Sequence, residues 1–559
     1  MTALAGSLGL CVLTVPPAWL GPQAREIYHR TFGEASFSAA PLNEAILLQT
    51  LEIDQICPPD RVPWREAHDI EGVAIAAVDD CLPDNPWDVA VSVKGANNVS
   101  HATLMQSLLA LDAVEKHDDL DGDGDPDVIR IRLELMELNG KSPDHAGVVP
   151  KFEIAPGVTP GLWVFAPKTR GMTTANFETT EVNRMIRLPS PVIRVEQGDT
   201  VHLTLENGHY LPHTIHFHGA DHPFKTPAGE GNDGVPIFSE HPTMPGKART
   251  YWLQSRQPGT TFYHCHVQPH THILMGLQGM LVVEENRPNN WVQTFNIGAG
   301  RVRAPSVAVK DGFQREYDLH YLEIDRELNN RIQEFTDARL VSRSIHRGYN
   351  IVQRAAEYYV LNGRSFPYTL RESLVVTTAG EKARLRVLNG GGEGLSLHFH
   401  GHKPTLTHRD GVALDDAQRE QRDVFWLSSA QRADFSLDTT DNGLDAYGAG
   451  AWLLHDHRER AVTTDGMGPG GDVSLVVYED YLDSSGLPKT VGGLQSLAPF
   501  FSADYYARKL PVFAGMGGHD LGQPGAATQR PTYRHLLFWV SCALIVVFSA
   551  LLWRSGRRA

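Results

Sequence analysis

The chain has 559 residues, of which 42% are hydrophobic and 21% are charged, a composition typical of globular rather than disordered or collagen-like proteins. This length exceeds one hydrophobic core and predicts roughly three to four domains of ~150 residues each. Lys and Arg total 50 against 66 Asp and Glu, and the formal charge of -16 excludes the basic surface of a nucleic-acid-binding protein. The informative excess is histidine, because 11 of the 26 fall between His202 and His272.

Both ends of the chain are apolar. Residues 1–24 lack a basic start, and we interpret them as a signal segment or as an uncleaved apolar segment. Residues 536–553 form an uncharged apolar run of 18, which just spans a bilayer, and a basic tail follows at 554–559. We therefore predict a linker at 483–535, a C-terminal transmembrane helix at 536–553, and an extracytoplasmic protein anchored to the membrane by that helix.

Residues 25–159 carry no strong architectural signature, and we interpret them as an N-terminal α+β region of unknown function. Apolar residues at near-helical spacing predict a helix at 101–116, and strict alternation predicts a strand at 128–135. Cys57 and Cys81 also lie in this region. A disulfide between them and a pair of free thiols both remain open.

An aspartate-rich loop lies between the predicted helix and the predicted strand. Asp119, Asp121 and Asp123 match the first ligand spacings of a calcium-binding loop. Arg130 stands where such a loop has its bidentate glutamate, and a strand follows in place of a helix. The loop is therefore interpreted either as a calcium site or as a solvated turn.

From about residue 160 the pattern changes to short alternating strands with turn signals, which is typical of β-sandwiches. Two stretches that resemble one another each precede a His-Phe-His-Gly motif, at His216–Gly219 and at His398–Gly401. A His-x-His triplet follows each motif further along the chain. This internal repeat predicts two related domains, at 160–290 and at 291–482.

The first repeat supplies a thiolate, two imidazoles and a thioether, which is the ligand set of a blue-copper electron-transfer site. Cys265, His270 and Met275 lie within one short loop, and His213 precedes the first histidine motif. Cys265 also lies between two histidines, and side chains alternate along a strand. One strand therefore offers its sulfur to one metal site and its two imidazoles to another.

The second repeat keeps the paired imidazoles and lacks a blue-copper site. Asp456 replaces the cysteine, and Leu395 stands where a counterpart of His213 would stand. Each repeat still contributes four histidines to the opposite face. These are His216, His218, His264 and His266 in the first repeat, and His398, His400, His455 and His457 in the second.

These motifs resemble those of the multicopper oxidases, which are built from cupredoxin domains. The resemblance covers about residues 160–482, with HxxHxH and HCHxxxHxxxxM in the first repeat, HxH pairs in the second, and a matching turn at Asn232–Pro236. It implies a mainly β fold with two cupredoxin-like Greek-key β-sandwich domains. It assigns His213, Cys265, His270 and Met275 to a type 1 copper, His216 and His398 to a type 2 copper, and His218, His264, His266, His400, His455 and His457 to a type 3 pair.

The resemblance also implies a laccase-like mechanism and about four coppers per chain. A donor would reduce the type 1 copper, and electrons would pass through Cys265 and its neighbours to a trinuclear cluster that reduces dioxygen to water. In two-domain relatives this cluster forms between the first domain of one subunit and the second domain of its neighbour, which implies a homotrimer. Asp456 and Asp221 are our candidates for proton delivery, chosen by proximity in the sequence.

Two other functions remain as alternatives. A copper-containing nitrite reductase also has a type 1 site in its first domain, but it needs fewer histidines. A non-catalytic cupredoxin-like scaffold would have lost ligands that are present here. Zinc is the main competing metal, and the sulfur and imidazole set favours copper. Phenols, ferrous or manganous ions and a small redox protein all remain open as donors, although only 10 Met argue against a cuprous oxidase.

Overall fold

The computed structural model describes residues 66–70, 72–75, 77, 113–123, 125–141, 149–168, 186–287, 294–303, 312–490, 496–509, 540 and 543–544. All but the last three belong to one compact unit, Asn43–Met516. The predicted signal segment, the Cys57 and Cys81 pair, and nearly all of the predicted anchor at 536–553 lie outside the described residues. Within the described ranges, no helix is long and apolar enough to cross a membrane.

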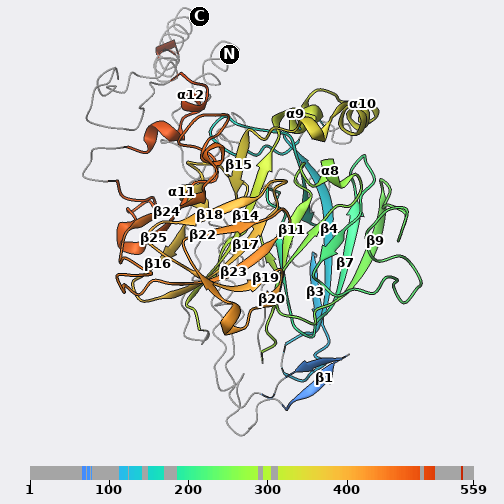
Figure 1. The fold of residues 1–559 in the computed structure, drawn as a ribbon. Helices are drawn as coiled ribbons and strands as arrows, with labels where there is room; N and C mark the ends of the chain where they lie inside the picture. The colour runs from blue at the N-terminus through green and yellow to red at the C-terminus, as the bar shows by residue number, and fades with distance from the viewer. Residues whose placement is uncertain are drawn as a thin grey trace, which may run out of the picture. The chain divides into compact units, whose positions relative to one another are not determined.

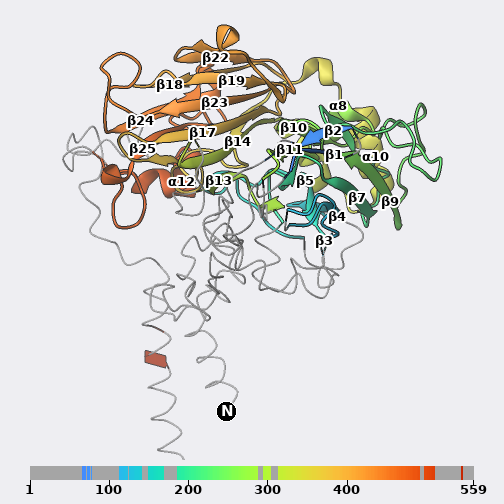
Figure 2. The same cartoon turned by 90° about the horizontal axis from the view of Figure 1, so that it is seen from below.

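Two β-sandwiches make up most of the described chain (Figures 1 and 2). In the first, one sheet has the order β3-β4-β7-β9 with β5 paired to β4, and the other has the order β12-β6-β11-β10-β8. The strands are β3 Val114–His117, β4 Val128–Leu138, β5 Leu162–Pro167, β6 Val192–Glu196, β7 Thr200–Asn207, β8 His216–His218, β9 Lys247–Gln254, β10 Gly259–His264, β11 Gln278–Glu284 and β12 Phe295–Asn296.

The second sandwich pairs a sheet of order β13-β14-β17-β23-β19-β20, joined by β15 and β21, with a sheet of order β16-β25-β24-β18-β22. The strands are β13 Gly300–Arg303, β14 Arg315–Ile324, β15 Tyr358–Leu361, β16 Val375–Thr377, β17 Lys382–Asn389, β18 Leu395–Phe399, β19 Thr405–Arg409, β20 Val412–Ala413, β21 Glu420–Gln421, β22 Val424–Leu427, β23 Arg432–Asp438, β24 Ala451–Asp456 and β25 Ser474–Tyr478. A separate hairpin joins β1 His68–Ile70 to β2 Val73–Ile75.

The two sandwiches share one strand topology. In the first, β4 runs parallel to β7 and β6 runs parallel to β11. In the second, β14 runs parallel to β17 and β16 runs parallel to β25. The mainly β fold with two related sandwiches is therefore confirmed.

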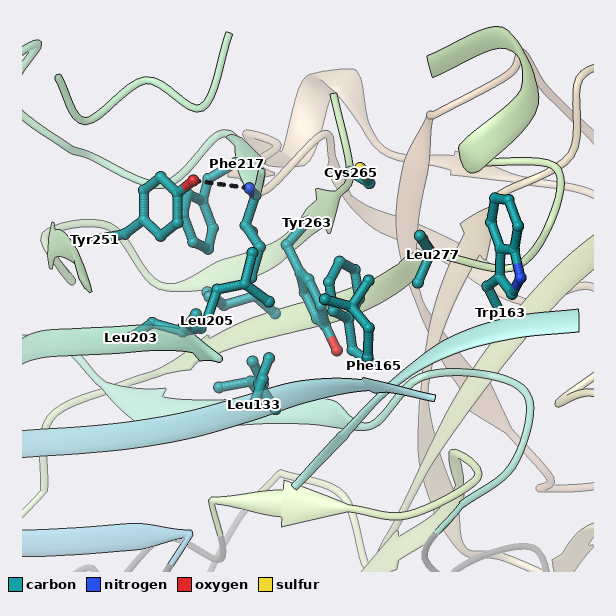
Figure 3. Packing of buried hydrophobic residues seen from close by; sticks show 14 of the residues in the cluster. Leu133, Trp163, Phe165, Leu203, Leu205, Phe217, Tyr251, Tyr263, Cys265 and Leu277 are labelled. Carbon is teal, nitrogen blue, oxygen red and sulfur yellow. Dashed lines mark hydrogen bonds between the residues drawn. The ribbon is translucent and has the colours of Figure 1, made fainter. Parts of the chain in front are cut away.

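The core of the first sandwich follows from side-chain alternation along its strands. In β7 every second residue is buried, so Leu203 and Leu205 enter the core while their neighbours stay half-exposed. Figure 3 shows these leucines beside Leu133, Phe165 and the other large side chains of the cluster. Burial of each such side chain stabilises the fold by about 1.5–3 kcal/mol.

The first sandwich begins earlier in the chain than predicted. The strand predicted at 128–135 is confirmed as β4, which pairs with β7 from Val128 to Glu134 and therefore belongs to this sandwich. The predicted boundary at residue 160 is wrong, because β4 lies before it and still belongs to the first sandwich. A strand that runs parallel to β7 cannot be its hairpin neighbour, so it comes from a more distant part of the sequence. Most of the predicted helix at 101–116 lies outside the described residues, and its last part forms β3.

A helical excursion, residues 326–353, interrupts the second sandwich between β14 and β15. Side-chain caps begin its two α-helices, because Asp325 accepts hydrogen bonds from two backbone amides and Asp337 accepts one. The excursion packs on the first sandwich, where Leu328 and Val341 join its core. Its elements are α9 Arg326–Asn330, η4 Arg331–Gln333, α10 Ala338–Arg343, the π-helical turn η5 Ser344–Gly348 and η6 Ile351–Gln353.

The remaining helices are short. In Figure 1, α8 of the first sandwich lies close to the helical excursion. These helices are α8 Pro269–His272, α11 Thr369–Glu372, α12 Ala503–Tyr506, η7 Asp416–Gln418, η8 Glu459–Val462, η9 Glu479–Tyr481 and η11 Ala498–Phe501.

Buried ion pairs join the two sandwiches. Arg194 on β6 donates two hydrogen bonds of 2.6 Å to Asp318 on β14. Arg386 on β17 donates one of 3.0 Å to Glu284 on β11. These bidentate and charge-assisted contacts fix how one sandwich meets the other.

Candidate metal centres

A cluster of sulfur and imidazole ligands lies inside the first sandwich. Cys265 directly follows β10, and its Sγ lies 3.5 Å from Nδ1 of His213 and 3.4 Å from Nδ1 of His272. The three ligand atoms lie within 4.8 Å of one another. Met275 is buried in the same core cluster. A thiol, two imidazoles and a nearby thioether fit a blue-copper centre. We call these four residues the type 1 cluster.

His272, and not the predicted His270, faces Cys265. Both histidines lie in α8, where two positions along a helix correspond to a rotation of about 200°. His270 is exposed, whereas His272 is 0% exposed. The assignment of His270 is therefore wrong, because the sequence spacing was read as an open loop while the chain forms a helical turn after Pro269.

Each imidazole of the type 1 cluster is contacted by a further histidine, at the ring nitrogen that does not face Cys265. Nε2 of His213 lies 2.9 Å from Nδ1 of His209, which also accepts a backbone hydrogen bond at 3.4 Å. Since that Nδ1 is an acceptor, His213 carries its proton on Nε2 and presents the Nδ1 lone pair to Cys265. Nε2 of His272 similarly lies 3.0 Å from Nε2 of His346 in the helical excursion.

Burial sets the protonation of the type 1 cluster. The ring of Trp163 covers it, with its centroid 5.2 Å from that of His272 (Figure 3 shows Trp163 and Cys265 in the core). Desolvation lowers the pKa of His213 and His272 well below the ordinary imidazole value and raises the pKa of the Cys265 thiol to about 12. The imidazoles are therefore ready to bind a metal, while the thiol keeps its proton until a cation replaces it.

Four histidines gather on the other face of the Cys265 strand, and we call them the first tetrad. His216 on β8 lies opposite His264 on β10 in the antiparallel register. Ligand nitrogens of His216, His218 and His264 lie within 4.8 Å of one another. The ring centroid of His266 lies 5.3 Å from that of His216. All four predicted members are together.

The second sandwich repeats this arrangement as the second tetrad. His398 on β18 lies opposite His455 on β24. Ligand nitrogens of His398, His400 and His455 lie within 4.8 Å of one another, and the ring centroid of His457 lies 5.2 Å from that of His398. The predicted members of this tetrad are also together.

Backbone carbonyls fix the same tautomer in both tetrads. Nδ1 of His264 donates to its neighbouring carbonyl at 2.9 Å, and Nδ1 of His455 does so at 2.8 Å. A carbonyl only accepts, so Nδ1 carries the proton and the Nε2 lone pair faces the other imidazoles. Burial lowers the pKa of His218 to about 4 and that of His264 to about 3. These neutral imidazoles suit copper or zinc.

The tetrads do not meet within one chain. Among the described residues, every ring contact between tetrad histidines joins members of the same tetrad. In the second tetrad, His400 and His457 are exposed. Each tetrad is therefore a separate cluster of imidazoles, and the second one is open to solvent.

Neither aspartate predicted to deliver protons lies at a tetrad. Asp456 occupies the position of Cys265, on the face of β24 opposite His455, and its carboxylate pairs with Arg458 at 2.6 Å. Asp221 is exposed, and nothing in the described part of the chain joins its carboxylate to a tetrad. The choice of Asp456 is wrong because proximity in sequence ignores which face of a strand a side chain occupies, whereas Asp221 lies between β8 and β9 and its role stays a prediction.

Two aspartates that sequence reasoning missed contact the tetrads. The Asp233 carbonyl accepts a hydrogen bond of 2.6 Å from Nδ1 of His216, and its carboxylate lies 3.5 Å from the same nitrogen. For Asp423 and His398 the corresponding distances are 3.2 and 3.8 Å. The motif Asn232–Pro236 was the signal that could have identified the first of these aspartates.

The aspartate-rich loop brings carboxylates together, with one change from the prediction. Oxygens of Asp119, Asp121 and Asp127 lie within 4.8 Å of one another, so Asp127 stands in place of the predicted Asp123. The Asp123 backbone amide instead donates to Asp119 at 3.1 Å. Burial, with a contribution from Asp121, raises the pKa of Asp127 to about 6. Calcium binding by this loop stays a prediction.

Comparison with known proteins agrees with this chemistry. Residues 169–288 match the family model described as multicopper oxidase. An iron transport multicopper oxidase of Gibberella zeae is 27% identical over 317 residues, which are 52% of this chain and 44% of that protein. A copper-containing nitrite reductase of Neisseria meningitidis is 35% identical over 100 residues, or 17% of this chain and 23% of that protein.

The structure of a blue copper oxidase from Nitrosomonas europaea is similar at 22% identity and a TM-score of 0.45, covering 70% of this chain and 96% of that one. The matched part spans less than half the length of the two relatives named above. The family match rests on the stretch that carries the type 1 cluster and the first tetrad. Over residues 169–288, this chain is similar to the multicopper oxidases.

Proposed function

We propose that the chain is an oxidase that accepts electrons one at a time at the type 1 cluster and reduces dioxygen to water at the tetrads. The observation that carries this proposal is the position of Cys265 between His264 and His266. Its sulfur faces one ligand cluster, and the adjacent imidazoles face another across the same strand. Copper held by these residues would supply the one-electron chemistry and the site for dioxygen.

The residues of the chain would orient the imidazoles, keep water away from the type 1 cluster and connect that cluster covalently to the first tetrad. The carbonyl bonds of His264 and His455 keep the Nε2 lone pairs facing inward. Trp163 and the core exclude water from the type 1 cluster, where Cys265 is 0% exposed. The peptide bond between Cys265 and His264 would give the shortest covalent route from the donor side to the dioxygen side.

We propose that the first tetrad of one subunit meets the second tetrad of a neighbour in a homotrimer. The separation of the tetrads within one chain supports this assembly, and so do exposed apolar residues beside them. Trp426, next to the strand of the second tetrad, is 62% exposed. Phe238, close in sequence to Asp233 of the first, is 83% exposed. Exposed apolar side chains of this size mark contact surfaces.

Asp233 and Asp423 are our candidates for delivering protons to dioxygen. Each carboxylate lies within 4 Å of an imidazole assigned to the type 2 position. Nε2 of His222 lies 3.2 Å from the Asp233 carboxylate, which extends this polar chain away from His216. An acid beside the reacting oxygen atoms is what four-proton chemistry requires.

The electron donor and the cellular location of the protein are also proposals. A phenol, a metal ion or a small redox protein would each satisfy the chemistry of the type 1 cluster. We also propose that the protein works outside the cytoplasm, held by the apolar segment at 536–553. Protease accessibility of the tetrad-bearing part in intact cells would test that location.

The test of the oxidase is copper content, electron paramagnetic resonance and oxygen uptake on the copper-loaded full chain. We expect about four coppers per chain, type 1 and type 2 signals, and oxygen consumption with hydroquinone. Copper absent after full loading would refute the proposal. Val267→Ala, a change in the same core cluster without a ligand atom, serves as the control.

Nitrite reduction is the second candidate function, because the 100-residue match to a nitrite reductase is the most identical of the relatives described above. Such an enzyme would bind about two coppers per chain and turn over nitrite in preference to oxygen. The presence of two complete tetrads favours the oxidase, since a single catalytic copper needs fewer imidazoles. The two acceptors should be compared in the same preparation.

A further inference from the structure

The type 1 cluster has no ligand at the protein surface. His213, Cys265, His272 and Met275 are each 0% exposed, so a donor in solution touches none of them. An electron must enter through a group that covers the cluster. Two histidines contact its imidazoles from outside, and they differ in exposure.

His346 is the covering group that reaches solvent. It is half-buried, and its Nε2 lies 3.0 Å from Nε2 of His272. His209, which contacts His213 on the other side, is only 5% exposed. Of these two histidines, His346 therefore offers the more exposed route, through one hydrogen bond to His272.

Exposed arginines lie on the same helical segment as His346, and Asp337 pairs with one of them, Arg339, at 2.6 Å. Arg339, Arg343 and Arg347 recur every four residues along α10 and η5, which places them on one side of the helix. All three are exposed. The excursion 326–353 carries five arginines and three acidic residues in a chain of net charge -16. We call Arg339, Arg343 and Arg347 the arginine stripe.

We propose that an acidic electron-transfer protein docks on the arginine stripe and delivers electrons to the type 1 cluster through His346. This inference rests on the proposed oxidase function, whose donor it identifies. Opposite charges steer two proteins together and orient them before contact. Leu340, 45% exposed on α10, adds an apolar contact next to the stripe.

The same surface disfavours the other donor classes. Ferrous or manganous ions need carboxylate or imidazole ligands and are repelled by guanidinium groups. A neutral phenol gains nothing from positive charge. A docked protein needs only to bring its own redox centre near His346. Each encounter oxidises the partner by one electron and reduces the site at Cys265 by one electron, and no bond or proton is exchanged.

The test is anaerobic stopped-flow reduction of the copper-loaded full chain, followed by loss of the blue absorbance. Three reductants serve as probes: a reduced acidic ferredoxin, whose iron–sulfur centre has no blue copper absorbance, a reduced basic cytochrome c, and hydroquinone. The variant R343E/R347E reverses two charges of the stripe. We expect it to slow reduction by the acidic ferredoxin at least about tenfold at low ionic strength, to leave reduction by hydroquinone unchanged, and not to slow reduction by cytochrome c.

A matched control separates docking from bulk charge. K382E/K489E makes the same change in net charge at two exposed positions, one on β17 and one in the segment after β25. This variant should reduce the rate with the acidic ferredoxin by less than about twofold. Equal slowing in the control and stripe variants, or no slowing in either, would overturn the proposal.

The role of His346 is tested by H346L and H346Q. We expect H346L to keep its copper and blue absorbance but to react at least about tenfold more slowly with the acidic ferredoxin, because the hydrogen-bonded contact to His272 is lost. The glutamine amide can accept that hydrogen bond, so H346Q should recover most of the rate. Full-speed reduction of H346L would exclude this entry route.

The design separates failure of this inference from failure of the oxidase. Reduction is measured without oxygen, so docking is tested even if dioxygen is not the acceptor. Oxygen uptake with hydroquinone combined with an unaffected stripe variant keeps the oxidase and rejects the docking site. A chain that never develops the blue absorbance rejects both.

Discussion

The two sandwiches place different polar groups at the same strand position. Cys265 follows β10 in the first, and Asp456 ends β24 in the second, and both are 0% exposed. The thiol lies among imidazoles that a metal can share. The carboxylate lies in an ion pair with Arg458, whose guanidinium also contacts Glu323 and Glu393 at 2.8 Å.

This comparison shows that the two faces of the strand pair vary independently. On the face opposite the second tetrad, an ion-pair network occupies the region that corresponds to the type 1 cluster of the first sandwich. Leu395 takes the position corresponding to His213. In front, the tetrads keep the same cross-strand register and the same carbonyl-bonded imidazoles. A buried polar group on one face needs polar partners, which are imidazoles for the thiol and a guanidinium for the carboxylate. Neither set of partners changes the opposite face.

The strongest way to break the comparison is to remove the sulfur. Cys265→Ser should abolish the blue absorbance and bring oxygen uptake to background, because the hydroxyl is a poor ligand for copper at a type 1 site. Total copper should fall by about one per chain, since the tetrads on the other face are untouched. Absorbance, metal analysis and oxygen uptake on one sample check this, and unchanged oxygen uptake would contradict it.

Breaking the ion pair of the second sandwich should cost stability instead of electron transfer. Arg458→Met leaves the Asp456 carboxylate buried and unpaired, and we expect a loss of about 3–5 kcal/mol in the free energy of unfolding. Replacement of Arg460, whose side chain is 53% exposed, by Met should change it by less than about 0.5 kcal/mol. Chemical denaturation of the copper-free chain measures both, and similar losses in the two variants would argue against the network.

Separate replacement of the two histidines of α8 tests which of them belongs to the type 1 cluster. His272→Gln should weaken copper binding at that site at least about tenfold, because it removes a direct ligand. His270→Gln should leave the blue absorbance intact, since that side chain is exposed. Copper titration followed by absorbance distinguishes them, and the reverse result would restore the original assignment of His270.

The pH dependence of copper uptake should differ between the two faces of the strand. The Cys265 thiol, with its pKa of about 12, must lose a proton when copper binds. Affinity there should fall about tenfold for each unit by which the pH is lowered from about 7.5 to about 5.5. With pKa values of about 4 and 3, His218 and His264 are already neutral in that range and release no proton.

Copper titrations across this range, reading blue absorbance for the sulfur site and total bound copper for the tetrads, measure the two slopes. The comparison of faces is correct if only the first slope is steep. Equal slopes would contradict it.

The amino-acid sequence by itself determined the repeated sandwich, the eight tetrad histidines and three of the four members of the type 1 cluster. Period-two alternation and fixed spacing decide which face of a strand a residue occupies, so Cys265 and His264 were separable without coordinates. The strand at 128–135 was predictable for the same reason, whereas its membership of the first sandwich was not.

Only the tertiary structure decided the features that depend on packing between distant segments. The turn of α8 selects His272 over His270, and the excursion 326–353 brings His346 to it from the other sandwich. Asp233 reaches the first tetrad by a hydrogen bond across 17 positions. Local patterns encode which side of an element is buried, but contacts between elements depend on how the whole chain closes around its core.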